Sequence, residues 1–184
     1  MMPGRRALLQ TSLAAGLLAT VAGLAYVADV PRALGLQDHD GWRPIAWPFP
    51  RDAWPPGNAW RHGDLEVYVR PKLGFCGNCD TGVVTDEEVD RVTDIDLLDE
   101  RFMPAQAGDQ VRVANLVGRA RLYKLKMRDG ARRLAEGFAV ASKCDLVVAI
   151  VLGDVAGEST RRAAHQFLES NTVQAWLNDL LEGR

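Results

Sequence analysis

Seven consecutive apolar residues at 146–152, Leu-Val-Val-Ala-Ile-Val-Leu, constrain the fold of this 184-residue chain more than any other segment. A run of this length, rich in β-branched residues, is typical of a central strand that is buried on both faces of a sheet. Gly153 and Gly157 interrupt the pattern, and apolar residues then recur at helical spacing over 158–170 and 172–181. The C-terminal part of the chain therefore predicts a central strand followed by two amphipathic helices.

Local patterns predict four further strands and one more helix. Residues 65–70 alternate between apolar and polar side chains, as a half-buried strand does. Thr85 and Glu88 have the spacing of a capping box, which predicts a helix from 86 to about 93. The remaining segments of strand-like composition are 111–113, 118–126 and 134–141. About five strands and three helices over 63–184 predict an α+β domain with a small mixed sheet, covered on at least one face.

The first 30 residues have the composition of an export signal or a membrane anchor rather than of a folded domain. Arg5 and Arg6 precede an apolar stretch at 7–28, whose uncharged core at 13–28 is 16 residues long. This length falls between the roughly 7–15 residues of a signal peptide and the about 20 of a spanning helix, so a cleaved signal and an uncleaved anchor both stay open. In either case we expect the arginines in the cytoplasm and the rest of the chain across the bacterial inner membrane, in the periplasm.

The paired arginines also carry a resemblance to a known class of signal. Arg5-Arg6, followed by Leu9 and Gln10, resembles the twin-arginine export signal, in which Phe and Lys usually occupy the last two of these positions. The resemblance implies export across the inner membrane. A small-x-small site at 23–25, Gly-Leu-Ala, is where a cleaved signal would end.

Residues 31–62 form a second unit, rich in tryptophan and proline. The segment holds six of the nine prolines and four of the five tryptophans. Because proline fixes φ and lacks a backbone N–H, we expect an extended arm rather than a helix or a central strand. Either its rings fill grooves on the folded domain, or they contact the membrane interface or a protein partner. The contact candidates are Trp42, Trp47, Trp54 and Trp60.

The cysteines are the strongest candidates for a disulfide, a redox function or a metal site. Cys76 and Cys79 form a CxxC pair, and in an exported protein we expect a structural disulfide between them. Three alternatives stay open: a disulfide from one of the pair to Cys144, a redox role, and a metal site. If Cys144 is not paired, we expect it to be a small core residue at the head of the central strand.

The CxxC pair also resembles the active site of thioredoxin-like oxidoreductases. Cys76-Gly77-Asn78-Cys79 follows Phe75 and a predicted strand, as in that family, and the resemblance implies thiol–disulfide exchange. In that family a helix begins at the first cysteine and its dipole lowers the thiol pKa. Here 80–84 intervene before the capped helix, and the following acids would raise the pKa of a thiol. We therefore favour a structural disulfide.

Charge is segregated along the chain. The formal net charge is −2 with a pI of about 5.9, which argues against a nucleic-acid partner. Residues 80–100 hold nine acids and one base, a net of −8, whereas 112–133 hold eight bases and one acid, a net of +7. Either the two segments are neighbours that compensate each other, or they form acidic and basic faces that orient a protein partner.

These patterns predict a protein that binds a partner rather than one that catalyses a reaction. His39, His62 and His165 are interpreted as surface or packing residues, and no catalytic residue, metal site or cofactor is assigned. We expect an exported or inner-membrane-anchored accessory protein of the periplasm, tethered through 7–28, with a protein partner and a structural CxxC disulfide. The alternative is a periplasmic thiol–disulfide oxidoreductase or a metal carrier that uses the CxxC pair.

Overall fold

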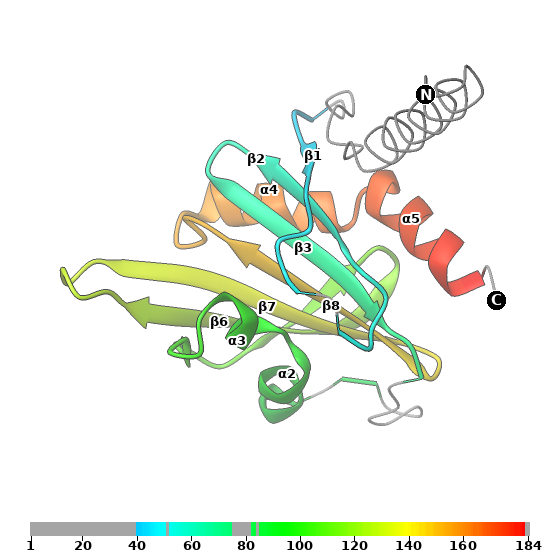
Figure 1. The fold of residues 1–184 in the computed structure, drawn as a ribbon, viewed down its shortest axis with the longest axis horizontal. Helices are drawn as coiled ribbons and strands as arrows, with labels where there is room; N and C mark the ends of the chain where they lie inside the picture. Colours follow the sequence, from blue (N-terminus) through cyan, green and yellow to red (C-terminus); the bar gives the residue numbers. More distant parts are fainter. Residues whose placement is uncertain (1–39, 51, 75–81, 84, 183–184) are drawn as a thin grey trace, which may run out of the picture. The chain divides into compact units, whose positions relative to one another are not determined.

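Eight antiparallel strands form the framework of the protein in the computed structural model (Figure 1). The structure describes residues 40–50, 52–74, 82–83 and 85–182, all of which belong to one unit, Gln37–Arg184. The described strands are β1 (Arg43–Ile45), β2 (Asn58–His62), β3 (Leu65–Lys72), β4 (Met103–Pro104), β5 (Asp109–Val113), β6 (Leu116–Lys126), β7 (Arg132–Ser142) and β8 (Asp145–Leu152). The described helices are α2 (Asp86–Val92), α3 (Ile95–Leu98), α4 (Glu158–Leu168) and α5 (Asn171–Glu182).

The strand order explains why β8 is so apolar. Along the sheet the order is β1-β2-β3-β8-β7-β6-β4, and β5 also pairs with β6. β8 therefore lies in the middle, paired with β3 on one side and β7 on the other. All of residues 146–152 are buried. The prediction of a central strand buried on both faces is confirmed.

The α+β class is confirmed, but the sheet is larger than predicted and is antiparallel rather than mixed. The five predicted strands correspond to β3, β5, β6, β7 and β8. β1 and β2 are not predicted from the sequence, because they belong to the proline-rich arm. Pro44 is nevertheless in β1, an edge strand, which is where a sheet tolerates proline. β4 is also not predicted, because a two-residue strand that includes Pro104 has no recognisable sequence pattern.

The three predicted helices are present as α2, α4 and α5, and α3 is an additional short one. The capping box of α2 is confirmed: the Glu88 N–H donates to Thr85 Oγ1 at 3.2 Å, and the Thr85 N–H donates to Glu88 Oε2 at 2.9 Å. Thr93 then ends α2 in extended backbone, so the helix does not continue into the segment 95–98. Residues 95–98 form α3 instead.

Each face of the sheet is covered by two helices (Figure 1). Side chains alternate along a strand, so Val147 and Ala149 of β8 face one layer and Val148 and Ile150 face the other. The first layer is completed by α4 and α5, whose inward residues are Ala164, Phe167, Leu168, Val173 and Leu177. The second is completed by α2 and α3, whose inward residues are Val89, Val92 and Ile95.

Candidate functional site

A single acidic side chain is buried in the middle of β7, among apolar residues. Glu136 is 0% exposed. Because side chains alternate along a strand, it faces the same layer as Phe138 and Val140, which α4 and α5 cover. Burying a carboxylate without partners costs several kcal/mol, so the groups that face Glu136 decide whether β7 can hold it.

Two residues of α4 supply the partners of Glu136. Arg161 donates through Nε and Nη2 to Oε1 at 3.0 and 2.6 Å, and His165 Nε2 lies 2.9 Å from Oε2. Their i, i+4 spacing puts both side chains on the same side of the helix. α4 is held in place by the adjacent stripe, where Ala164 and Phe167 are buried against the sheet.

Arg161 and His165 keep the carboxyl group of Glu136 ionised. Burial opposes ionisation, but the hydrogen bonds from His165 and Arg161 outweigh it and hold the pKa of the Glu136 carboxyl below its usual range. The hydrogen bond to Glu136 in turn raises the pKa of the Arg161 guanidinium. The His165 ring also packs edge-on against Phe138, with centroids 5.1 Å apart. Charge-assisted hydrogen bonds therefore join α4 to β7.

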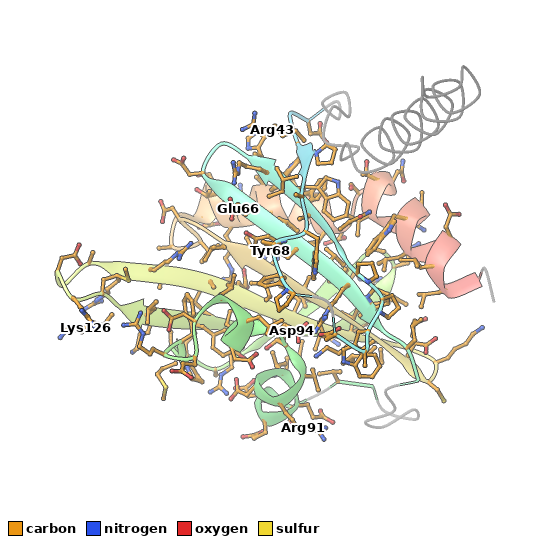
Figure 2. The ribbon with its side chains drawn as sticks, in the orientation of Figure 1. Arg43, Glu66, Tyr68, Arg91, Asp94 and Lys126 are labelled. Carbon is orange, nitrogen blue, oxygen red and sulfur yellow. The ribbon has the colours of Figure 1, made fainter. Side chains whose placement is uncertain are left out.

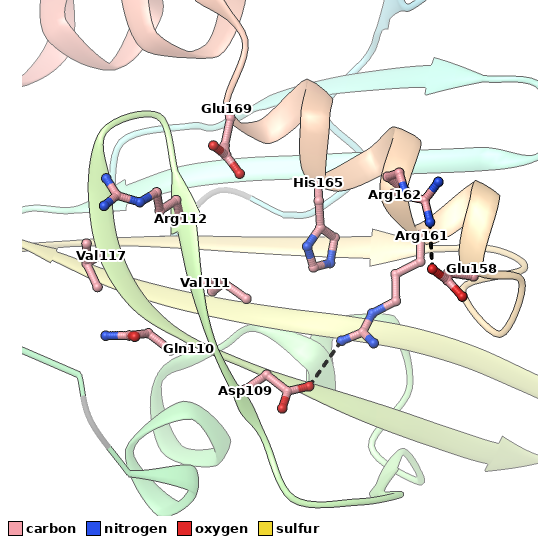
Figure 3. A pocket seen from close by; sticks show the side chains of 10 residues that line it. All are labelled: Asp109, Gln110, Val111, Arg112, Val117, Glu158, Arg161, Arg162, His165 and Glu169. Carbon is pink, nitrogen blue, oxygen red and sulfur yellow. Dashed lines mark hydrogen bonds and ion pairs between the residues drawn. The ribbon is translucent and has the colours of Figure 1, made fainter.

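The ion cluster opens into a groove of about 580 Å³ between α4 and the β5–β6 hairpin (Figure 3). Arg161 spans this groove, because its Nη2 also lies 3.5 Å from Oδ2 of Asp109 on β5. Figure 3 shows Arg161 and His165 pointing from α4 toward the hairpin. The residues that line the groove are Asp109, Gln110, Val111, Arg112, Val117, Glu158, Arg161, Arg162, His165 and Glu169.

β5 forms one wall of the groove and has an open edge. It pairs with β6 around a two-residue turn, and in such a hairpin alternate residues exchange hydrogen bonds with the partner strand. Asp109, Val111 and Val113 are the residues that bond to β6 in this register. The backbone N–H and C=O groups of Gln110 and Arg112 point the other way, where no described strand pairs with them.

This arrangement can bind an extended chain. An added strand would satisfy the outward N–H and C=O groups of β5, and the groove beside it would take alternate side chains. Val111 and Val117 offer apolar surface, while Glu158 and Arg162 offer charges of both signs. The geometry combines a strand edge with a facing helix, which is the arrangement that strand-addition recognition uses.

Two of the four arm tryptophans are core residues. Trp42 and Trp60 are 3% and 6% exposed, and both contact Phe167 of α4, with ring centroids 4.2 and 5.3 Å apart. Such aromatic pairs contribute about 0.5–1.5 kcal/mol each beyond the area they bury. The structure thus corrects the choice of Trp42 and Trp60 as contact candidates, because their rings pack between the sheet and α4 rather than on the surface.

The other two tryptophans are half-buried. Trp47 and Trp54 line a small cavity of about 260 Å³ together with Asp52 and Arg70. Trp47 packs edge-on against Phe49, with centroids 5.0 Å apart. These two rings keep part of their surface, so they stay candidates for contact with a partner.

A second ion cluster is buried on the opposite face of the sheet, under α2 and α3. Arg70 Nε and Lys72 Nζ lie 2.5 and 2.8 Å from the two carboxylate oxygens of Asp94. Arg70 also donates to Asp52 at 2.7 Å, and Lys72 donates to the Val92 carbonyl at 2.6 Å. Burial disfavours the charge on Arg70, but its hydrogen bonds to Asp94 and Asp52 outweigh this and raise its pKa.

The acidic and basic segments of the sequence are neighbours. Asp86 and Asp90 of α2 form ion pairs with Arg119 and Arg121 of β6. Tyr123 also donates to Asp90 at 2.6 Å, and burial together with this hydrogen bond raises the pKa of the phenol above its usual range. Part of the −8 and +7 charge is therefore compensated inside the fold.

The cysteines fall into two groups. Cys76 and Cys79 lie outside the described residues, so their disulfide stays a prediction. Cys144 is exposed, which corrects the expectation of a small core residue. It does not begin the buried strand but follows Lys143, which has a φ of 56°, in the two-residue turn between β7 and β8.

The described residues on both sides of 75–81 lie against the β7–β8 hairpin. The Gly74 N–H donates to Asp145 Oδ1 at 2.7 Å. A Cβ placed on Gly82 would lie 3.5 Å from that of Ala141. The positions before and after the CxxC segment are therefore both next to the hairpin that carries Cys144.

Sequence reasoning misses the site at Glu136, although one signal is present. Glu136 is the only charged residue within 134–141, a segment read as a strand. A lone acid in an apolar strand needs a cationic partner, and Arg161 with His165 at i, i+4 on an amphipathic helix offers one. The sequence alone indicates only a surface or packing role for His165, because its pairing with Glu136 depends on the tertiary structure.

No known protein-family model and no curated protein matches this chain. Within the part of the chain that the structure describes, no helix has both the length and the apolar surface needed to span a bilayer. Over the same residues, no three or more His, Cys, Asp or Glu side chains gather in a way that would hold a metal ion.

Proposed function

We propose that this chain is an exported accessory protein of the bacterial periplasm that binds an extended segment of a protein partner. Residues 7–28 would either tether it to the inner membrane or be removed as a signal. The groove between α4 and β5 would be the binding site. The function is thus recognition, with the CxxC pair as a structural disulfide.

The open edge of β5 is the observation that carries this proposal. Gln110 and Arg112 offer outward backbone groups next to a groove of about 580 Å³. Exposed strand edges invite pairing with another chain, and proteins usually shorten, cover or bend them. A strand added here would lie beside Arg161 and His165, which Glu136 holds in position.

The test uses a phage-displayed library of random ten-residue peptides, selected on the full chain in detergent. The affinity of the selected peptides is then compared between wild type, Gln110→Pro and Gln110→Ala. Proline removes the outward N–H but leaves the β5–β6 ladder intact, so we expect Gln110→Pro to weaken binding about tenfold or more. Gln110→Ala should bind like wild type. Equal affinity of all three proteins would refute strand addition.

The alternative function is thiol–disulfide exchange by the CxxC pair. The observation that favours it is the position of the exposed Cys144 on the β7–β8 hairpin, because Gly74 and Gly82, on either side of 75–81, both lie against this hairpin. A structural disulfide should have a reduction potential below about −300 mV, and a catalytic one should lie well above it. Titration of wild type with dithiothreitol, with Cys76→Ser and Cys79→Ser as controls, separates the two functions.

A metal carrier and the membrane tether are tested on the exported protein itself. Stoichiometric metal in protein purified from the periplasm would support a carrier, whereas a metal-free, oxidised protein would exclude it. Intact mass decides the fate of the N-terminus. Loss of residues 1–25 would show that the signal is cleaved and that 7–28 is no lasting anchor.

A further inference from the structure

The β6–β7 hairpin extends past the rest of the sheet (Figure 1). On β6 the pairing with β4 ends at Lys124, and on β7 the pairing with β8 ends at Ala135. Beyond these positions the two strands pair with each other as far as Lys126 and Arg132, and the Leu134 carbonyl also accepts a hydrogen bond of 3.5 Å from the Gly153 N–H. The turn closes with a hydrogen bond from the Met127 N–H to the Ala131 carbonyl at 2.8 Å. We call residues 124–133 the hairpin tip.

The hairpin tip is strongly basic. Its five bases and one acid give a net charge of +4. The five bases, all exposed, are Lys124, Lys126, Arg128, Arg132 and Arg133. The acid, Asp129, accepts a hydrogen bond from the Ala131 N–H at 2.9 Å and so belongs to the turn. Apart from Arg112 on β5, the bases of the +7 segment that do not pair with α2 are therefore all in the hairpin tip.

Apolar side chains are exposed among these cations. Met127 at the turn is 38% exposed and Met103 on the adjoining strand β4 is 61% exposed. A hollow of about 680 Å³ lies beside Met103, between Arg101, Lys124, Lys126 and Arg132. Cations around a hollow that Met103 also lines, with Met127 exposed at the nearby turn, match a phosphate headgroup with its acyl chains.

We propose that the hairpin tip docks on a membrane surface that contains anionic phospholipids. The cations would contact the phosphate groups, and Met103 and Met127 would enter the boundary between headgroups and acyl chains. The choice of a membrane as the occupant rests on the proposed tether at 7–28, which would hold the domain close to a bilayer. A single-stranded nucleic acid needs stacking aromatic side chains, and residues 124–133 contain none.

The experiment follows hydrogen exchange in the full chain mixed with vesicles. One set of vesicles is pure phosphatidylcholine and the other contains about one third phosphatidylglycerol, a composition that gives a negative surface potential. Flotation of the vesicles reports the tether, whereas deuterium uptake of residues 124–133 reports the hairpin tip. We expect slower uptake at 124–133 only with the anionic vesicles, and loss of this protection at high salt.

Charge-reversal variants identify the residues responsible. Lys126→Glu with Arg132→Glu removes two tip cations, and each lost cation should weaken docking about fivefold. Arg43→Glu with Arg91→Glu makes the same change in net charge at exposed positions away from the tip (Figure 2) and should leave the protection unchanged. Circular dichroism and thermal unfolding establish that both double variants are folded.

The outcomes separate the two proposals. Failure to float with phosphatidylcholine vesicles overturns the tether, and flotation with anionic vesicles then measures hairpin docking directly. Equal uptake at 124–133 in both vesicle types, or equal loss of protection in both double variants, overturns the docking proposal. Protection by a 20-nucleotide single strand, without protection by anionic vesicles, would instead assign the surface to nucleic acid.

Discussion

The two faces of the sheet each hold a buried ion cluster, and the clusters differ in what can reach them. Under α2 and α3, Asp94 pairs with Arg70 and Lys72, whose side chains are 4% and 10% exposed. Under α4, Glu136 is wholly buried, but its partners Arg161 and His165 are 31% and 26% exposed. The first cluster lies in the core and reaches the surface through the pair of Arg70 with Asp52, whereas the second opens into a groove through both partners of its acid.

This difference in exposure indicates that the Asp94 cluster stabilises the fold and that the Glu136 cluster can take part in recognition. When one member of a closed cluster is removed, the others are left charged and buried. When the acid of the open cluster is removed, Arg161 and His165 can turn toward water in the groove. The groups around Glu136 can therefore adjust to a bound chain, while those around Asp94 cannot. Substitutions in the two clusters should therefore lower the free energy of unfolding by different amounts.

Asp94→Ala should have the largest effect on stability. It leaves Lys72 buried without a carboxylate and Arg70 with Asp52 alone, and breaking a buried ion pair typically costs about 3–5 kcal/mol. Urea denaturation measures the free energy of unfolding. Asp96→Ala is the control, because Asp96 is exposed on α3 and its loss should change stability by less than about 0.5 kcal/mol. Similar losses for Asp94→Ala and Asp96→Ala would show that the α2–α3 cluster is not structural.

Glu136→Gln should cost less, about 1–3 kcal/mol, because an amide keeps the shape and some hydrogen bonds while Arg161 and His165 reach solvent. The same urea titration measures it, with Glu158→Gln as the exposed control. If Glu136→Gln destabilised the protein more than Asp94→Ala, the contrast between a closed and an open cluster would be wrong.

The pH dependence should distinguish Glu136→Gln from wild type. The folded-state pKa of Glu136 lies below its usual value of 4.5, so this group adds stability above pH 4.5 and loses that contribution as the pH falls through the folded-state value. We expect wild type to lose stability more steeply than Glu136→Gln when the pH is lowered below 4.5. Parallel curves from pH 7 to pH 3 would contradict the assigned charge on Glu136.

The smallest effect on stability is expected for substitutions at the N-termini of α2 and α4. α2 starts with the Thr85 capping box, whereas the N-cap of α4, Gly157, makes no side-chain capping bond. Thr85→Ala should therefore cost about 1 kcal/mol. Ser159→Ala, at an exposed position in the first turn of α4, should be neutral within about 0.5 kcal/mol in the same denaturation assay. A neutral Thr85→Ala would mean that the box adds nothing to the fold.

Much of the fold could be predicted because its signals are local. The apolar run at 146–152, the alternation at 65–70 and the capping box at Thr85 each define an element without reference to the rest of the chain. β1 and β2 could not be predicted in this way. β1 pairs with β2, and β2 pairs with β3 around a two-residue turn, but β1 is only three residues long and the prolines of the arm favour an irregular interpretation.

The candidate site could not be predicted because it depends on tertiary structure. Glu136 and His165 are 29 residues apart in the sequence and meet only after β7 and α4 pack together. The open edge of β5 depends on strand order, which a single sequence does not define. The tryptophans of the arm were conspicuous in the sequence, yet Trp42 and Trp60 serve the core.

Amide hydrogen exchange in β5 tests the central claim most directly. In the unliganded protein, the Gln110 and Arg112 amides should exchange much faster than those of Val111 and Val113, because only the latter bond to β6. A peptide selected on the full chain should slow Gln110 and Arg112 and leave Val111 unchanged. If Gln110 and Arg112 already exchange as slowly as Val111 without peptide, the edge is not open and the proposed binding mode is contradicted.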